Sequence, residues 1–214
     1  MKYIKDQYSA YLRKELTPQR EKRIPDTRLH VVLYFIQPSG HALLPLDIAA
    51  MKKIAEVANV VPVIAKADSL TVEERQAFKS RIKAELAFHD IRVYPFVDVD
   101  EQFQLGETDQ EERAALESIK HIIPFAVCGS ERNTVLDGKT VRGRRTRFGV
   151  VNIEDPRHCE FIHLRDFLFR THTEDLIEST ASVHYEAFRT RQLLALKESS
   201  LQNASRPPTA ADNH

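Results

Sequence analysis

The sequence predicts an α/β fold: a parallel sheet with helices on both faces, followed by a hairpin and C-terminal helices. Two observations carry this prediction. Short apolar runs rich in β-branched and aromatic residues, at 30–36 and 60–65, alternate with stretches of helical character at 47–58 and 71–88. Strand, helix and strand at this spacing are typical of a βαβ unit with parallel strands. The chain has 214 residues, 42% of them hydrophobic, and is therefore long enough to bury a sizeable core.

The charge balance limits the partners that composition alone suggests. Lysine and arginine total 31, equal to the 31 aspartates and glutamates, so attraction to a nucleic acid or a membrane needs a local patch. We expect no nucleic-acid partner. No apolar run approaches the roughly 20 residues of a membrane span, and the first residues do not resemble a secretory signal. Two cysteines and nine scattered histidines form no ligand pattern, so we expect a cytoplasmic protein without a metal site of its own.

Local patterns justify each element of the first half. Residues 1–16 place apolar side chains at helical spacing. The run 30–36 is nearly continuous in apolar residues, as expected of a strand covered on both faces. Asp47 can cap a helix that reaches about residue 58. A second buried strand spans 60–65, where Pro62 indicates an edge or a bulge because proline donates no ladder hydrogen bond.

The middle of the chain continues the alternation. Thr71, followed three residues later by Glu74, forms a capping box and predicts a helix to about residue 88. Residues 93–96 predict a third short strand, and the acidic residues 98–112 predict a solvated loop. A helix to about residue 121 then leads into a fourth strand at 122–127.

The pattern changes from residue 130 onward. Asp137 and Gly138 predict a tight hairpin turn, because both tolerate the positive φ of a type I′ turn. A further strand is expected at 148–153. The remaining segments are predicted to be two helices and a disordered tail, at 160–170, 174–197 and 198–214.

The turn after the second strand carries the clearest chemical signal. Ligands of parallel α/β sheets bind beyond the carboxyl ends of the strands, and Lys66 and Asp68 lie at such an end. A carboxylate there can accept two parallel hydrogen bonds from the N1–H and N2–H groups of guanine, while the lysine stem lies along the ring. The alternative is that Asp68 only caps the following helix. Lys-x-Asp alone leaves both interpretations open.

A second candidate feature is a basic hairpin. Five cations fall within nine residues, at Lys139, Arg142, Arg144, Arg145 and Arg147. One interpretation is an anion or phosphoinositide patch. The other, which we favour except at Arg144, is a solvated face partly neutralised by the acidic loop.

Ten short segments, in order along the chain, resemble those of the septin GTPase domain. They include the Ala65-Lys66-Ala67-Asp68 element and lie at 33–41, 45–48, 61–68, 124–130, 141–144, 149–151, 158–161, 164–165, 171–172 and 184–186. The similarity is greatest to short fungal septins that lack a C-terminal coiled coil. It implies that residues 1–197 are the C-terminal part of a Ras-like GTPase domain, in which 148–191 is the septin unique element.

The resemblance also implies roles for individual residues. Lys66 and Asp68, with Ala67 and Ser69 in the same element, would bind guanine. Gly129 would bring its backbone close to the base, and Arg144 would stack its planar guanidinium on the ring. A further set would reach the neighbouring subunit across the nucleotide-containing interface: His41, Glu74 and His158, with Phe148 at an aromatic position of the unique element.

The phosphate-binding half of such a site is missing from this sequence. It contains no Gly-x-x-x-x-Gly-Lys-Ser/Thr, and only six glycines in all. Phosphates need that loop, and Mg²⁺ needs its hydroxyl, so the magnesium ligands of the family are absent and we expect no GTP hydrolysis. The resemblance implies a GTP- or GDP-binding cytoskeletal subunit that assembles with other septins into filaments at the division site, septum and cell cortex. A working small GTPase and a nucleotide-free fragment that binds septins are the alternatives.

Overall fold

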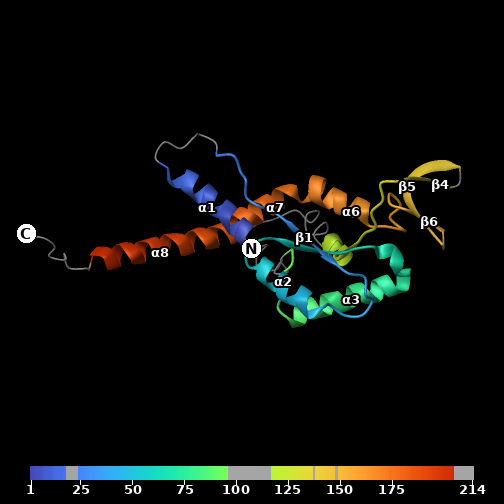
Figure 1. Cartoon of the computed structure of the whole chain (residues 1–214), viewed down its shortest axis with the longest axis horizontal. Helices are drawn as coiled ribbons and strands as arrows, with labels where there is room; N and C mark the ends of the chain where they lie inside the picture. The colour runs from blue at the N-terminus through green and yellow to red at the C-terminus, as the bar shows by residue number, and fades with distance from the viewer. Residues whose placement is uncertain (18–23, 96–116, 137, 148, 205–214) are drawn as a thin grey trace, which may run out of the picture.

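The computed structural model describes residues 1–17, 24–95, 117–136, 138–147 and 149–204 (Figure 1). Its main sheet has three parallel strands, β1 (Val32–Ile36), β2 (Val60–Ile64) and β3 (Phe125–Ala126), in the order β1-β2-β3. Helix α2 (Pro45–Ala55) joins the first two strands, and α3 (Val72–Phe88) follows β2. The βαβ unit predicted from the sequence is confirmed.

The central strand divides the core into two halves. Val61 and Val63 face a cluster that includes Leu164 and Phe167, whereas the alternate residues of β2 face Phe78 and its neighbours on the other side. Because side chains alternate along a strand, a fully buried strand needs apolar residues at both sets of positions. Figure 1 shows α2 and α3 on one side of the sheet and α6 and α7 on the other. Helices on both faces are thus confirmed.

The first two strands differ from expectation in their surroundings. β1 begins at Val32, two residues later than predicted, and is only half covered, with Phe35 57% exposed. Among the described residues it pairs with β2 alone. Pro62, in contrast, lies in the central strand, so the prediction of an edge or bulge was wrong. The Val60 carbonyl accepts from the Tyr94 amide and the Ile64 carbonyl from the Val127 amide, so the backbone of Pro62, which lies between them, faces the same side. On that side β2 pairs with β3 only from Val63 onward, so no partner needs a donor from Pro62.

Two further strand predictions are corrected. Residues 93–95 form no strand, although the Tyr94 amide donates to the Val60 carbonyl at 2.9 Å. Residue 96 and the loop predicted at 98–112 lie outside the described residues. The fourth predicted strand is reduced to the two residues of β3, since 117–122 are helical.

The start of α3 was predicted correctly, whereas the predicted start of α2 was not. The capping box of α3 is confirmed: the Thr71 hydroxyl accepts from the Glu74 amide at 3.2 Å, and the Glu74 carboxylate accepts from the Thr71 amide at 2.9 Å. Helix α2 begins at Pro45 rather than Asp47 and ends at Ala55. Asp47 sits in its first turn, where it accepts a hydrogen bond from the Tyr34 hydroxyl at 2.8 Å.

A smaller antiparallel sheet projects from the main domain. Its strands are β4 (Asn133–Leu136), β5 (Lys139–Thr146) and β6 (Gly149–Asn152), in that order. Leu136 pairs with Lys139, which confirms the predicted hairpin, and Gly138 has the positive φ, +76°, that its turn requires; Asp137 lies outside the described residues. Gly143 is required for close packing, because a Cβ there would lie 2.6 Å from the Val151 carbonyl oxygen.

Helical segments complete the fold. They are α6 (Phe161–Asp166), η3 (Phe167–Thr171), α7 (Thr173–Ser179), η4 (Thr180–Tyr185) and α8 (Glu186–Ala204), with η3 and η4 in the wider π geometry. The predicted break falls at His172. Residues 198–204 are helical, so the tail predicted from 198 onward was wrong for these seven; 205–214 lie outside the described residues.

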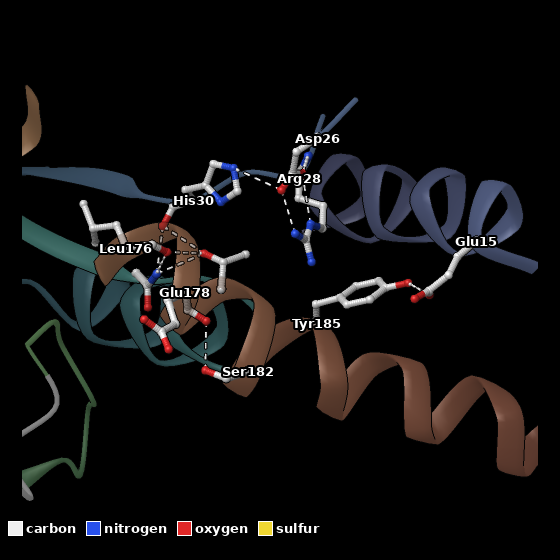
Figure 2. A network of polar contacts seen from close by, with 10 residues as sticks. Glu15, Asp26, Arg28, His30, Leu176, Glu178, Ser182 and Tyr185 are labelled. Carbon is white, nitrogen blue, oxygen red and sulfur yellow. Dashed lines mark hydrogen bonds and ion pairs between the residues drawn. The ribbon is translucent and has the colours of Figure 1, made fainter. Parts of the chain in front are cut away.

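The N-terminal helix packs against the junction of η4 and α8 and against the segment after α2. In α1 (Lys2–Leu16), Tyr8 is fully buried and donates to the Val57 carbonyl at 2.9 Å. Tyr185 donates to the Glu15 carboxylate at 2.7 Å, and Arg28 lies over its ring, 4.8 Å from the ring centre (Figure 2). No described helix is both long enough and apolar enough to cross a membrane.

Candidate functional site: the hollow at the ends of β2 and β3

The turn after β2 has an unusual backbone. Lys66 adopts the left-handed conformation, with a φ of +49°, and the short helix η1 (Ala67–Ser69) follows it. For a residue with a Cβ this conformation costs about 1–2 kcal/mol. The Ala67 amide donates to the Val127 carbonyl at 3.0 Å. This bond fixes the turn against the end of β3, so residues from two strand ends meet here.

Asp68 is the buried carboxylate of this turn. Its side chain is 7% exposed, and its Oδ2 lies 3.3 Å from Nη1 of Arg144. Its Oδ1 is buried and has no hydrogen-bond partner. Thr71, not Asp68, caps α3, so the simple capping alternative is wrong. An acceptor oxygen is therefore held inside the protein with no N–H or O–H donor, although burial of an unpaired acceptor is unfavourable; the Cys128 thiol, a weak donor, interacts with the same carboxylate.

A cavity of about 850 Å³ opens next to this turn. Gly129 and Arg144 are in its wall, and its full lining is Cys128, Gly129, Ser130, Glu131, Arg132, Asn133, Thr134, Arg142, Gly143, Arg144, Arg145, Ile153 and Phe161. A Cβ added to Gly129 would meet no atom within 4 Å. The backbone of Gly129 therefore faces open space that any side chain would partly fill.

Arg144 connects the cavity with the Lys66–Ser69 turn. It lies on β5, opposite Val151, and its side chain is 50% exposed. The same guanidinium lines the cavity and pairs with Asp68. The guanidinium is half exposed whereas its carboxylate partner is buried, so Arg144 lies at the boundary between the turn and the cavity.

Cys128 also lines this cavity. It is buried, and burial together with the neighbouring Asp68 carboxylate raises the pKa of its thiol to about 11. The thiol therefore stays protonated at neutral pH and is a poor nucleophile. Its chemical character here is that of a small apolar wall.

The other predicted site residues are placed less centrally. Lys66 and Ser69 are exposed on the turn, whereas Ala67 is buried beneath it. His41, Glu74 and His158 are exposed and do not line the cavity. The Glu74 carboxylate is engaged in the α3 capping box, and the His158 ring accepts a hydrogen bond from the Asn152 amide at 3.2 Å. Phe148 lies outside the described residues, so its role stays a prediction.

A buried ion pair next to the site was also missed. Lys79 of α3 is 4% exposed, and its Nζ lies 2.7 Å from both carboxylate oxygens of Glu160. Burial lowers the pKa of Lys79, and the Glu160 carboxylate partly offsets this effect. One signal was available in the sequence: Lys79 falls at core spacing between Phe78 and Ile82.

The chemistry available here is a buried hydrogen-bond acceptor beside open space. The orphan oxygen of Asp68 needs a donor, and Gly129 leaves room for a flat ring. Among the described residues, no group of three or more histidine, cysteine, aspartate or glutamate side chains could hold a metal ion.

A protein-family model described as Septin matches residues 1–202. The chain belongs to the septin family. Septin homolog spn2 of Schizosaccharomyces pombe is 54% identical to it over 200 residues, which cover 94% of this chain and 58% of that protein. Cell division control protein 10 of Candida albicans is 52% identical over 207 residues, which cover 97% of this chain and 55% of that protein. This septin chain thus spans little more than half the length of these relatives.

The fold comparison agrees. The crystal structure of a septin GTPase domain from Chlamydomonas reinhardtii matches with a TM-score of 0.65 at 23% identity, covering 88% of this chain and 66% of that chain. The α/β fold with a parallel sheet and helices, as part of a septin GTPase domain, is confirmed.

Proposed function

We propose that this septin chain binds the guanine base of GTP or GDP in the hollow formed by Lys66, Asp68, Gly129 and Arg144. The observation that carries the proposal is the buried Asp68 oxygen without a donor, next to a glycine whose missing side chain leaves open space. Guanine supplies two parallel donors to a carboxylate, whereas adenine lacks this donor pair. Arg144 would release Asp68 and stack on the ring.

We further propose that the chain acts as a subunit of septin filaments in the cytoskeleton at the division site. Septin membership and the names of relatives such as cell division control protein 10 support this role. Other septin subunits would be its partners, and the base would be buried as a structural ligand. The exposed cations of β5 would meet an anionic surface, such as a phosphoinositide membrane at the cortex. His41, Glu74 and His158 would face the neighbouring subunit.

Turnover of the nucleotide is not part of this proposal. The sequence given contains no phosphate-binding loop, so it offers neither the amide cradle nor the hydroxyl that phosphates and Mg²⁺ require. Magnesium-dependent release of phosphate from GTP by this purified chain would favour the alternative, an active GTPase.

The Asp68→Asn variant tests base recognition. Asparagine offers one donor and one acceptor where aspartate offers two acceptors, so it matches xanthine, which carries a carbonyl in place of the guanine amino group. The wild-type chain should bind guanosine or GDP about tenfold or more tightly than xanthosine or XDP, since a charge-assisted hydrogen bond contributes about 1.5–3 kcal/mol. Asp68→Asn should reverse this order in calorimetric or NMR titrations.

A matched control is Glu73→Gln, which removes one exposed charge from the first turn of α3 without touching the hollow. It should leave the preference for guanine unchanged. Equal binding of adenosine and guanosine by the wild type, or an unchanged preference in Asp68→Asn, would contradict the proposal.

A further inference from the structure

In the part of the chain that the structure describes, the outer edge of β3 is closed by Cys159 and Glu160 rather than by a strand. The Ala126 amide points away from β2 and donates to the Glu160 carboxylate at 2.7 Å, while the Ala126 carbonyl accepts from the Glu160 amide at 3.0 Å. Glu160 thus imitates the pairing of a neighbouring strand. Lys79 holds both oxygens of this carboxylate at 2.7 Å and also donates to the Ile122 carbonyl at 2.8 Å.

Cys159 repeats this arrangement one step further along the edge. The Cys128 amide donates to the Cys159 sulfur at 3.2 Å, and the Cys159 thiol donates to the Cys128 carbonyl at 3.6 Å. The pKa of the Cys159 thiol is raised chiefly by burial, so the thiol keeps the proton that this second bond needs. Two consecutive residues therefore satisfy the outward-facing backbone groups of residues 126 and 128.

The inward-facing residue between them is bound from the other side. The Val127 amide donates to the Ile64 carbonyl at 2.9 Å, and its carbonyl accepts from Ala67 at 3.0 Å. After Gly129, the Ser130 hydroxyl donates to the Gly143 carbonyl of β5 at 2.8 Å. Gly129 has no side chain to fix its own position. Its place beside Asp68 is thus determined by the anchors on both sides of it.

We propose that Cys159 and Glu160 are positioning residues for guanine recognition. They hold the end of β3 in place and thereby fix the position of the Gly129 backbone next to the base. This inference rests on the proposed function of the Asp68 hollow. Neither residue touches the base; each acts through Ala126 or Cys128. The segment after β6 thereby contributes to the selectivity of a site more than 80 residues away from Lys66–Ser69 in the sequence.

The test compares Cys159→Ala with Cys159→Ser in the full chain. Alanine removes both bonds to Cys128, whereas serine keeps a donor and an acceptor at a similar place. We expect Cys159→Ala to speed hydrogen exchange at the Cys128 amide at least tenfold, to shift the Gly129 amide resonance and to weaken guanosine binding at least fivefold. Cys159→Ser should restore most of each property.

Leu176→Ala serves as the control for general destabilisation. Leu176 is buried in the same core, and its side chain makes no hydrogen bond with β3. This variant should lower the melting temperature but leave the affinity for guanosine unchanged. The ratio of the amide hydrogen-exchange rates at Cys128 and Phe125 should also stay the same.

The outcomes separate the two proposals. If the wild type binds no guanosine, the proposed function fails and the positioning role fails with it. If the wild type binds guanosine but Cys159→Ala binds it equally well, only the positioning role is overturned. An equal loss of affinity in Leu176→Ala would also overturn it, because the effect would then be one of stability.

Discussion

Asp68 and Lys66 each hold an unfavourable state that the rest of the chain must offset. A buried acceptor without a donor costs about 1–3 kcal/mol, and a left-handed residue with a Cβ costs about 1–2 kcal/mol. Both lie within one three-residue stretch at the carboxyl end of β2. Costs of this kind concentrate at binding sites, where a ligand relieves them. Two such costs within one turn mark the Lys66–Asp68 stretch as a candidate binding site.

Two glycines near the hollow give contrasting predictions. In Gly129→Ala the new methyl group would meet no atom within 4 Å, so the free energy of unfolding should change by less than about 0.5 kcal/mol. Guanosine binding should nevertheless fall at least tenfold, because the methyl group fills space meant for the base. Urea unfolding and guanosine titration of the same sample measure both quantities.

Gly143→Ala is the matched opposite. Its Cβ would lie 2.6 Å from the Val151 carbonyl oxygen, so the β5–β6 pairing must shift at a cost of about 1–3 kcal/mol.

A Gly129→Ala variant that binds guanosine as the wild type does would show that the base does not approach the backbone of residue 129.

Between elements, the strongest electrostatic connection is the Lys79–Glu160 pair, which joins α3 to the segment that precedes α6. Both side chains are almost fully buried, and Ala126 and Ile122 supply further hydrogen bonds. Burial of two charges is costly, so the value of such a pair depends on keeping both partners. Removal of one partner leaves a charge in the interior without compensation.

We therefore predict strong non-additivity between these two positions. Lys79→Met and Glu160→Gln should each lower the free energy of unfolding by about 3–5 kcal/mol, whereas the double variant should lose clearly less than the sum. Urea denaturation of the four proteins measures the coupling. Simple additivity would mean that the two charges do not compensate each other in the folded chain.

Element types were more predictable from the sequence than strand positions. The Thr71–Glu74 capping box located α3 to the residue, because its hydrogen bonds are local. Pro62 was misassigned, since its position in the sheet depends on where β3 begins, more than 60 residues away. The same limit applies to residues 93–95, whose apolar composition resembles a strand. In the structure the Tyr94 amide bonds to the Val60 carbonyl, but these residues form no strand.

At the scale of the whole molecule, three partly or fully buried histidines make stability depend on pH. Burial is the main reason why the pKa values of His30, His172 and His184 are lowered. His184 is hydrogen-bonded to the buried amide of Asn59 at 3.2 Å, and the His30 ring lies 3.8 Å from Asp26 (Figure 2). The folded chain thus resists protonation of all three.

The sign of the pH dependence follows from linkage. As the pH falls, the histidines of the unfolded chain take up protons near their ordinary pKa of about 6.5, before those of the folded chain do. The contribution of the neutral histidines to the free energy of unfolding is therefore complete above about pH 6.5. It is lost as the pH falls through the lowered pKa values of the folded chain. Each histidine can add up to about 1.4 kcal/mol per pH unit to the slope. Urea unfolding at pH 7.5, 6.5 and 5.5 should show decreasing stability, with a smaller slope in His184→Gln. Stability that is constant over this range would contradict the prediction.

The sequence alone determined the kinds of elements, the order of the βαβ unit, the hairpin at Gly138 and the turn that carries Lys66 and Asp68. These features depend on periodicity, capping and turn chemistry, which act over a few neighbouring residues. Only the tertiary structure decided that one Asp68 oxygen has no donor, that Arg144 reaches the other, and that Cys159 and Glu160 close the edge of β3. Each of these contacts joins residues 30 or more positions apart, so packing, and not local pattern, brings them together.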